Sequence, residues 1–348
     1  MHVQPTPTPT PAATKNAKSR GAALIERLGD LRALCDPPEK EKEKEADGAG
    51  DHAVEELGLL VDEPMSRHTT LRLGGPADLW ARPRRLGALQ RLLACAHTHS
   101  IPVTFVGSGT NLLVRDQGIR GLVINLGRLN KVYRHEPKDR PGDLEVEAGA
   151  STGKLLKQAL QWSLGGIEFL GGVPGSVGGG LVMNAGTYLG EFTDVVTEVR
   201  SLSQTGALIR RDHDACGFRY RASDLPTNEI VIGASLGLQP RDQDQIKADV
   251  ADLKSRRRDR EPSGVANSGS TFKNPPGDYA GRLIESAGLK GKRVAGAFVS
   301  PKHANWLVVE RRAPCRAADL LALIDIVRDE VAAKHGIHLD LELRVIGE

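Results

Sequence analysis

Seven consecutive residues, Gly269–Pro275, bring together side chains that can do chemistry on a small anion. An alcohol, Ser270, and an amine, Lys273, stand in a stretch that begins with glycine and ends with proline. Glycine lets the backbone approach a ligand or adopt a positive φ, and proline removes a backbone donor and prevents a helix. We therefore predict a loop that presents Ser270 and Lys273 to an anionic ligand; an ordinary polar turn is the alternative.

Two glycine-rich stretches earlier in the chain are typical of a backbone that binds an anion. Val106–Leu113 joins two apolar runs through a Gly-X-Gly turn, whose amide groups can form an anion-binding concavity, although a tight hairpin is the alternative. Gly171–Gly180 is so rich in glycine that it is costly to order unless the backbone lies against a ligand such as a pyrophosphate. Met183–Gly186 follows closely enough to contribute. Neither stretch is a Walker A or a Rossmann motif, so we expect another kind of nucleotide site.

Two further stretches carry charged residues whose partners the sequence leaves open. Within Cys216–Ser223, arginines alternate with aromatic residues, and a strand would place Arg219 and Arg221 on one face. A strand over Leu341–Val345 would place Glu342 on the face opposite the apolar residues. The alternatives are surface arginines and a solvated strand face.

Composition argues against several classes of partner. The formal net charge of +3 over 348 residues gives no case for nucleic acid as the main partner, and aromatic residues, at 4%, are scarce for base stacking. The basic run 254–260 is best explained as a helix end whose cations complement the helix dipole. Apolar runs fall short of the ~20 residues that span a bilayer, so we expect no membrane insertion. The widely spaced cysteines predict no disulfide framework and no metal site, and they fit a reducing cytoplasm; they are Cys35, Cys95, Cys216 and Cys315.

The first fifty residues differ from the rest of the chain. Residues 1–20 are rich in proline and threonine and have little to bury, so we expect disorder, and they lack the apolar segment of a secretory signal. Leucines at helical spacing in residues 21–35 indicate a marginal helix on a tether, or a short docking helix. Pro37–Gly50 is a charged linker.

Periodicity and turn residues predict the elements that position these motifs. Strands and helices mix without a regular βαβ order, which indicates an α+β fold. The expected strands are Ala77–Ala81, Val103–Val106, Leu112–Val114, Leu122–Asn125, Leu144–Glu147, Val195–Leu202, Ile230–Leu238, Ala295–Val299, Trp306–Val309 and Leu339–Ile346. The expected helices are Leu86–Thr98, Thr152–Ser163, Asp242–Arg260, Tyr279–Ala287 and Ala317–Lys334.

Taken together, the motifs resemble the UDP-N-acetylenolpyruvoylglucosamine reductase (MurB) family of flavoenzymes. The resemblance covers roughly Glu55 to Glu348. One branch of the family has an extra tyrosine-bearing loop between its arginine and serine motifs, and Arg221 and Ser270 are too close in sequence to hold it, which indicates the shorter branch. The motifs follow the family order: Leu73–Asp78, Gly107–Leu113, Gly172–Gly179, Met183–Gly186, Tyr220–Ser223, Gly269–Pro275, Ala280–Glu285, Gly288–Gly291 and His303–Asn305.

The resemblance implies an architecture in three parts. An FAD-binding domain of the vanillyl-alcohol-oxidase type, made of two subdomains, would hold FAD non-covalently, and a C-terminal α/β domain would close over a nucleotide sugar. The expected divisions are a tail and linker over 1–50, FAD-binding subdomains over 51–118 and 119–240, and a substrate-binding domain over 241–348. The chain would be a cytoplasmic, monomeric oxidoreductase of peptidoglycan precursor synthesis.

The implied reaction reduces UDP-N-acetylglucosamine enolpyruvate to UDP-N-acetylmuramate. NADPH would reduce FAD, the flavin would pass a hydride to the vinyl carbon, and NADPH and the sugar would use one pocket in turn. The resulting enolate needs positive or donor groups where its charge develops, and a proton at the adjacent carbon. By matching position, Arg221 would stabilise the carboxylate and enolate, Ser270 would donate the proton, and Glu342 would share in hydrogen bonding or proton transfer.

The match also assigns binding residues. The sugar nucleotide would be contacted by Tyr220, Lys273, Asn274 and Lys302, although Lys302 stands where glutamine often occurs. Trp306–Arg311 departs from the family pattern, because it lacks the usual asparagine and glycine. The residues expected to hold FAD are Gly107, Ser108, Gly109, Thr110, Asn111, Leu112, Gly172, Val173, Gly175, Ser176, Gly179, Asn184 and Gly186.

Two other functions compete with this interpretation. Another FAD-dependent oxidase or dehydrogenase of the same fold would share the glycine-rich turns but would not need Gly269–Pro275 together with a C-terminal glutamate. A non-enzymatic nucleotide-sugar sensor would be expected to lose the trio, yet Arg221, Ser270 and Glu342 are all present.

Overall fold

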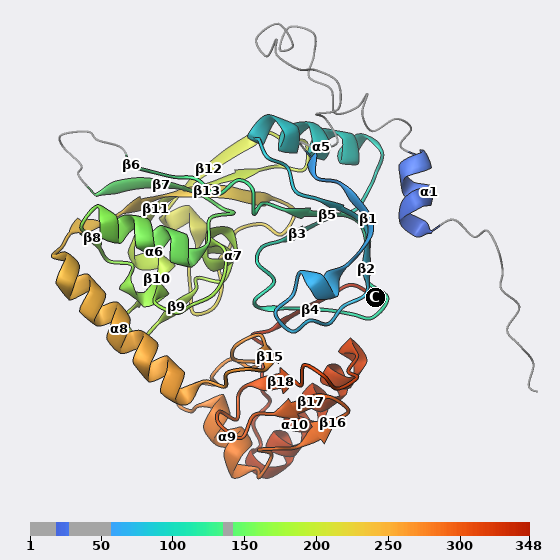
Figure 1. Ribbon diagram of the computed structural model, residues 1–348, viewed down its shortest axis with the longest axis vertical. Helices are drawn as coiled ribbons and strands as arrows, with labels where there is room; N and C mark the ends of the chain where they lie inside the picture. Colours follow the sequence, from blue (N-terminus) through green and yellow to red (C-terminus); the bar gives the residue numbers. More distant parts are fainter. Residues whose placement is uncertain (1–18, 28–56, 135–141) are drawn as a thin grey trace, which may run out of the picture.

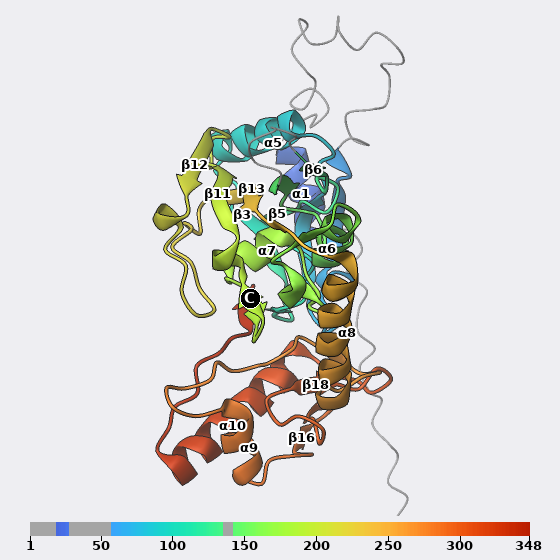
Figure 2. The same ribbon diagram turned by 90° about the vertical axis from the view of Figure 1, so that its left-hand side faces the viewer.

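Two lobes, joined along one side by a long helix, form the protein (Figures 1 and 2). The computed structural model describes residues 19–27, 57–134 and 142–348. We call residues 57–134 and 142–260 the large lobe, and residues 261–343 the C-terminal lobe. The connecting helix is α8 (Gln243–Arg260).

A four-stranded mixed sheet begins the large lobe. Its order is β1-β2-β5-β3, with β1 antiparallel to β2 and the other neighbours parallel. The helix α5 buries Leu89, Leu92 and Leu93 against this sheet, as its apolar spacing predicts. The strand β3 ends directly before the glycine turn 107–109, so the sheet positions this turn. The bounds are β1 (Leu60–Pro64), β2 (Pro76–Ala81), α5 (Leu86–Thr98), β3 (Val103–Val106) and β5 (Ile119–Asn125).

A five-stranded antiparallel sheet completes the large lobe. Its order is β12-β11-β13-β7-β6, and its buried residues share one continuous core with α5 and the first sheet. Both glycine-rich stretches are therefore fixed to the same core. The bounds are β6 (Val132–Arg134), β7 (Asp143–Glu147), α6 (Thr152–Gln161), α7 (Val177–Val182), β11 (Val196–Leu202), β12 (Leu208–Asp212) and β13 (Ile230–Gly237).

Short elements connect these sheets. The hairpin formed by β9 and β10 becomes important at the site described below. The bounds are η1 (Met65–Arg67), β8 (Leu164–Gly165), η2 (Glu168–Leu170), β9 (Gly186–Thr187), β10 (Gly190–Glu191), η3 (Phe192–Asp194), η4 (Asp214–Cys216) and β14 (Gln239–Pro240).

The C-terminal lobe has a small antiparallel sheet, ordered β15-β18-β17-β16, and two helices. Leu320, Ile324, Val327 and Val331 form the buried stripe of α10, at the spacing expected from the sequence. The bounds are β15 (Ala266–Asn267), α9 (Ala280–Ser286), β16 (Arg293–Val294), β17 (Ala297–Val299), β18 (Leu307–Val309) and α10 (Ala317–His335).

Several contacts fasten the lobes together. The last strand, β19 (Arg344–Ile346), returns to the large lobe and pairs in parallel with β4 (Leu112–Val114), so the C-terminus lies beside β4 in Figure 1. The carboxylate of Asp116, in the large lobe, accepts the backbone N–H groups of Ala317 and Ala318 and thereby caps α10.

The helix α8 lies with the large lobe, although the sequence grouped it with the C-terminal domain. Its buried residues, Ile246 and Leu253, lie on the side that packs against α6 and η2. The side chain of Arg241, just before the helix, donates to Glu168 Oε1 at 2.6 Å. This helix therefore packs on the large lobe and ends where the C-terminal lobe begins.

Most predicted elements occur within two residues of their expected bounds, and three expectations need correction. The strand expected over Leu339–Ile346 is reduced to β19, because Leu339–Leu343 crosses the Ser270 loop and pairs with it only by a bridge between Leu341 and Phe272. Arg219 and Arg221 do not share a strand face, because residues 219–222 form a tight turn.

The third correction concerns residues 21–35. Residues Arg20–Arg27 form α1, which lies against β1 and β2 (Figure 1). Gly21 is buried so tightly that a Cβ on it would lie 2.2 Å from the carbonyl oxygen of Asp78. The helix therefore docks on the large lobe. The other leucines of that segment and the linker Pro37–Gly50 lie outside the described residues.

No helix among the described residues has both the length and the apolar character needed to cross a membrane.

We predict that a half-buried ion pair contributes to the stability of the large lobe. The guanidinium of Arg211 on β12 donates to both oxygens of Glu229, at 2.6 and 2.7 Å. These hydrogen bonds hold the pKa of Glu229 below its ordinary value of 4.5. Glu229→Gln should therefore cost about 1.5–3 kcal/mol at neutral pH.

The pH dependence of unfolding checks this assignment. A carboxyl with a lowered pKa contributes stability above its unfolded pKa and loses it as the pH falls below about 4.5. Chemical denaturation at pH 7 and pH 3 should thus show a gap between wild type and Glu229→Gln that narrows in acid. Glu198→Gln, which breaks a more exposed Arg–Glu pair on the same sheet, should change stability by less than about 1 kcal/mol. Equal losses in both variants would contradict the assignment.

Candidate active site

Two of the three residues expected to react, Arg221 and Glu342, contact each other where the two lobes join, and the chain segment of the third, Ser270, lies beside them. Nε of Arg221 donates to Oε1 of Glu342 at 3.1 Å. The backbone N–H of Glu342 donates to the carbonyl oxygen of Thr271 at 2.9 Å, which places Glu342 beside the residue that follows Ser270. The site thus combines one segment of the large lobe with two of the C-terminal lobe.

A tight turn presents Arg221. The backbone N–H and carbonyl groups of Arg219 and Ala222 exchange two hydrogen bonds of 3.0 Å, and Arg221 adopts a left-handed φ of 54° between them. That conformation is uncommon for a residue other than glycine and is often found where function requires it. The guanidinium carbon lies 5.2 Å from the ring centre of Tyr220, whose side chain is half exposed. Tyr220 and Arg221 therefore occupy the same part of the site.

The Ser270 loop is held by the asparagine of the His303–Asn305 motif. The side chain of Asn305 accepts the backbone N–H of Phe272 at 3.0 Å and donates to the carbonyl oxygen of Phe272 at 2.8 Å. The carbonyl oxygen of Asn305 also accepts the N–H of Thr271 at 2.8 Å. Asn305 is 3% exposed, so it acts as a buried clamp on the loop. Sequence reasoning quoted this motif but assigned it no role.

Glu342 combines burial with nearby positive charge. Its side chain is 18% exposed. Burial raises the pKa of the Glu342 carboxyl above its ordinary value, and the cations of Arg221 and Lys273 partly oppose that rise. A carboxyl in this setting can take up and release a proton more readily near neutral pH than an exposed glutamate can.

The glycine-rich stretches face each other across a narrow gap in the large lobe. A Cβ on Gly107 would lie 2.4 Å from Oγ of Ser176, and a Cβ on Gly109 would lie 1.9 Å from the carbonyl oxygen of His68. Gly172 and Gly175 both have positive φ, 78° and 151°. Gly109, Gly172 and Gly175 have backbone conformations that favour glycine, and the exposed backbone around them fits an anionic group such as the pyrophosphate of FAD.

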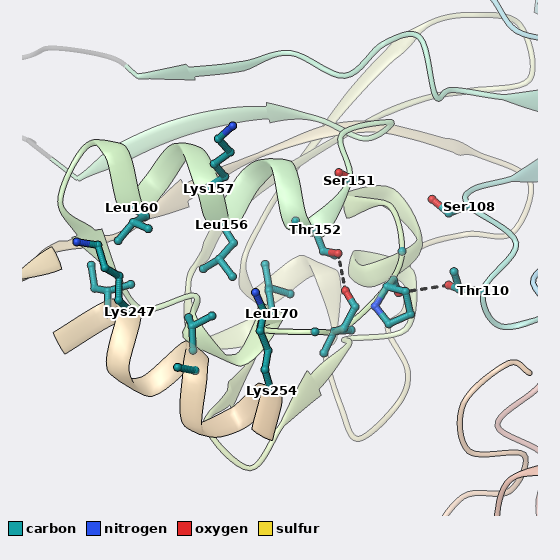
Figure 3. A pocket seen from close by; sticks show the side chains of 18 residues that line it. Ser108, Thr110, Ser151, Thr152, Leu156, Lys157, Leu160, Leu170, Lys247 and Lys254 are labelled. Carbon is teal, nitrogen blue, oxygen red and sulfur yellow. Dashed lines mark hydrogen bonds between the residues drawn. The ribbon is translucent and has the colours of Figure 1, made fainter. Parts of the chain in front are cut away.

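A cavity of about 810 Å³ adjoins this cradle and extends between α6 and α8 (Figure 3). Ser108 and Thr110 line one end, and Thr110 donates to the carbonyl oxygen of Pro174 at 3.4 Å. Leu156 and Leu160 of α6 point into the cavity in Figure 3. The lining is mainly apolar, and its size and shape suit one half of an extended dinucleotide.

Some predicted binding residues have other partners in this structure. The side-chain amide of Asn111 donates to the carbonyl oxygen of Glu342 at 2.9 Å, so this residue connects the cradle to the reacting trio. Asn274 accepts the backbone N–H of Ala280 at 3.1 Å and thus holds the start of α9. Lys302 donates to the carbonyl oxygen of Arg258 at 2.6 Å and is exposed.

Asn184 and Gly186 take part in holding Arg221. Asn184 is 1% exposed, and its side chain donates to Glu191 at 2.7 Å and to the carbonyl oxygen of Arg219 at 3.3 Å. The carbonyl oxygen of Gly186 accepts Nη2 of Arg221 at 3.2 Å. Sequence reasoning missed Glu191 altogether, because an acidic residue after a glycine turn is common and its closeness to Arg221 depends on the tertiary fold.

Family models match most of the described chain. Residues 77–212 match the model of an FAD binding domain, and residues 261–346 match the model of the UDP-N-acetylenolpyruvoylglucosamine reductase C-terminal domain. The second match begins directly after α8, where the packing also changes lobe.

Curated relatives and a solved structure agree with these matches. UDP-N-acetylenolpyruvoylglucosamine reductase of Agathobacter rectalis is 41% identical over 302 residues, which cover 84% of this chain and 95% of that protein. The reductase of Moorella thermoacetica is 44% identical over 292 residues, covering 84% and 94%. The crystal structure of MurB from Thermus caldophilus superimposes with a TM-score of 0.70 at 33% identity, covering 83% of this chain and 98% of that one. The chain belongs to the UDP-N-acetylenolpyruvoylglucosamine reductase (MurB) family.

Proposed function

We propose that this protein catalyses the NADPH-dependent, FAD-mediated reduction of UDP-N-acetylglucosamine enolpyruvate to UDP-N-acetylmuramate, a step of peptidoglycan precursor synthesis. The observation that carries the proposal is the pairing of Arg221 with Glu342 directly beside the Ser270 loop. An oxidase that only shares the FAD-binding fold has no need of this arrangement.

FAD, when bound in the cradle and reduced by NADPH, supplies the hydride that adds to the vinyl carbon of the substrate. The backbone of residues 107–112 and 172–179 would hold the pyrophosphate of FAD through amide groups. Tyr220, Lys273 and Lys302 contact the nucleotide sugar, and the amide group of Asn274 faces the same ligand. NADPH and the sugar occupy the site in turn.

Arg221 fixes the carboxylate of the enolpyruvyl group and stabilises the charge that develops on it. The negative charge spreads from the carbon that bears the carboxylate into the carboxylate oxygens as an enolate. A fixed guanidinium at that position needs no reorganisation during the reaction, which is the usual advantage of a preorganised site. The hydrogen bond from Nε to Glu342 orients the guanidinium.

Ser270 donates the proton that the same carbon must receive. A serine hydroxyl is a weak acid, so it can serve only a strongly basic carbanion, and an enolate meets that condition. Glu342 shares its proton with this exchange, and its raised pKa suits that role. The cations of Arg221 and, to a lesser extent, Lys273 limit how far the pKa of Glu342 rises.

We further propose that the protein acts as a cytoplasmic monomer, with the FAD-binding part over 51–240 and the substrate-binding part over 241–348. All three reacting residues come from one chain, which supports a site that is complete without a partner. The packing of α8 and the family match from residue 261 favour moving the boundary to the end of that helix.

The direct test uses the purified protein under anaerobic conditions. We expect a yellow flavin spectrum that NADPH bleaches and that UDP-N-acetylglucosamine enolpyruvate restores, with formation of UDP-N-acetylmuramate. Rapid reoxidation by oxygen with an alcohol substrate, and no response to the sugar, would contradict the proposal.

Replacing Ser270 should separate the two half-reactions. Ser270→Ala keeps the cradle and Arg221, so reduction of the flavin by NADPH should stay within about twofold of wild type. Transfer to the sugar should fall by ~100-fold or more, because a general acid typically contributes 10²–10⁴-fold. Stopped-flow absorbance measures both steps. Ser268→Ala removes a buried hydroxyl from the same loop and should leave both rates near wild type; equal losses in the two variants would assign the effect to loop structure.

The charge of Lys273 should set the pH response of the sugar half-reaction. The rate of the sugar half-reaction should change with pH as Glu342 titrates. Because Lys273 lowers the pKa of Glu342, Lys273→Met should move the midpoint of this pH dependence to higher pH. Single-turnover rates between pH 5 and pH 9 measure that midpoint. Lys292→Met, which removes an exposed lysine of the same lobe with no role in the site, should leave the midpoint in place. A midpoint that moves equally in both variants would contradict the pairing of Lys273 with Glu342.

A methyl group in the cradle should weaken FAD binding. In Gly109→Ala the new Cβ would lie 1.9 Å from the carbonyl oxygen of His68, so the turn must move away from residues 68 and 69. Overpacking of this kind costs about 1–3 kcal/mol, and we expect FAD affinity to fall roughly 10-fold. Titration of apoprotein by flavin fluorescence measures the change. Gly87→Ala, in α5, where the nearest atom to a Cβ is 3.5 Å away, should keep wild-type affinity.

A further inference from the structure

We propose that Glu191 is a positioning residue that holds the guanidinium of Arg221 from the side opposite Glu342. This inference rests on the function proposed above and adds a residue that the expected trio does not include. It places a second carboxylate, from the β9–β10 hairpin, beside the arginine that contacts the substrate.

The nitrogen atoms of Arg221 show why a second partner is needed. Nε donates to Glu342 and Nη2 donates to the carbonyl oxygen of Gly186. Nη1 is buried and has no hydrogen-bond partner among the described residues, but Oε1 of Glu191 lies 3.6 Å from it. If these two atoms came slightly closer, Nη1 would donate a hydrogen bond to Glu191 and every nitrogen of the guanidinium would have a partner.

Glu191 is itself held in place. Its Oε2 accepts Nδ2 of Asn184 at 2.7 Å, and the side-chain oxygen of Asn184 accepts the backbone N–H of Thr193 at 2.9 Å. The backbone N–H of Glu191 donates to Asp194 at 2.8 Å. The carboxylate therefore belongs to a network and is not a mobile surface group.

The same hairpin supplies both contacts on this side of Arg221. Gly186 on β9 pairs with Glu191 on β10, and a Cβ on Gly186 would lie 2.4 Å from the carbonyl oxygen of Gly190. The hairpin is thus closed tightly, and Asn184 Nδ2 also donates to Arg219 at the start of the turn that carries Arg221. The network ties the hairpin to that turn.

This arrangement has an electrostatic consequence. Arg221 lies between two carboxylates, so its charge is shared between Glu342 and Glu191. The side chain of Glu191 is 29% exposed, which lets it balance the guanidinium without contacting the substrate. Removing its charge leaves Arg221 less neutralised toward Glu342 and leaves one buried nitrogen without a nearby acceptor charge.

Glu191→Gln in the FAD-loaded, full-length protein tests the proposal. We expect flavin content and NADPH reduction within about twofold of wild type. The rate of the sugar half-reaction should fall about 10–100-fold through misplacement of Arg221.

The pH profile separates positioning from a general loss of structure. Loss of the Glu191 charge favours the ionised form of Glu342, so its midpoint in the sugar half-reaction should move to lower pH, opposite to the shift expected for Lys273→Met. Glu191→Asp keeps the charge and should retain a midpoint nearer to wild type.

Asp194→Asn is the matched structural control. It alters the same hairpin at the partner of the Glu191 N–H group but leaves the carboxylate beside Arg221 in place. We expect a near-normal sugar half-reaction and an unmoved midpoint. A loss in Asp194→Asn equal to that in Glu191→Gln, or a Glu191→Gln protein with wild-type rate and midpoint, would overturn the inference. A wild-type protein that does not act on the sugar would instead overturn the proposed function.

Discussion

The anchoring of Glu342 is the constraint on which the site depends. Its backbone N–H is held by Thr271 of the C-terminal lobe, its carbonyl oxygen by Asn111 of the large lobe, and its carboxylate by Arg221. One residue therefore fixes three segments that lie far apart in sequence. Parallel pairing of β19 with β4 follows immediately and keeps this junction in register. A shift of one residue in that pairing would move Glu342 away from Arg221.

Two kinds of support act on the junction. Backbone contacts, such as the Asp116 cap on α10 and the Asn305 clamp on the Ser270 loop, set the positions of the chain segments. Charged contacts then set the protonation of the reacting groups, because burial raises the pKa of Glu342 and the nearby cations oppose the rise. Arg221 belongs to both kinds of support, because it holds the carboxylate of Glu342 in place and also opposes the rise of its pKa.

The cradle and the reacting trio are also physically connected. Asn111 belongs to the glycine turn expected to hold FAD, yet its side chain holds the backbone of Glu342. Asn184 and Gly186, also expected at the cofactor, contact Glu191 and Arg221. The cradle expected to hold the cofactor therefore shares Asn111 with the contacts that fix Glu342.

Local patterns in the sequence predicted most of the helices and strands, whereas the roles expected for Arg221, Ser270 and Glu342 came from the resemblance to the family. Apolar spacing placed α5 and the buried stripe of α10, because amphipathic periodicity depends only on neighbours along the chain. Glycine at a position where a Cβ would meet backbone, as at Gly109, can likewise be recognised from the sequence, because it stands in a glycine-rich motif. Tertiary structure alone decided the turn at Arg221, the docking of α1 and the closeness of Glu191 to Arg221. The last two features depend on packing and charge contacts between segments distant in sequence, which no local pattern specifies. The turn is closed by local hydrogen bonds between Arg219 and Ala222, but the alternation of arginine and aromatic residues there fits a strand equally well.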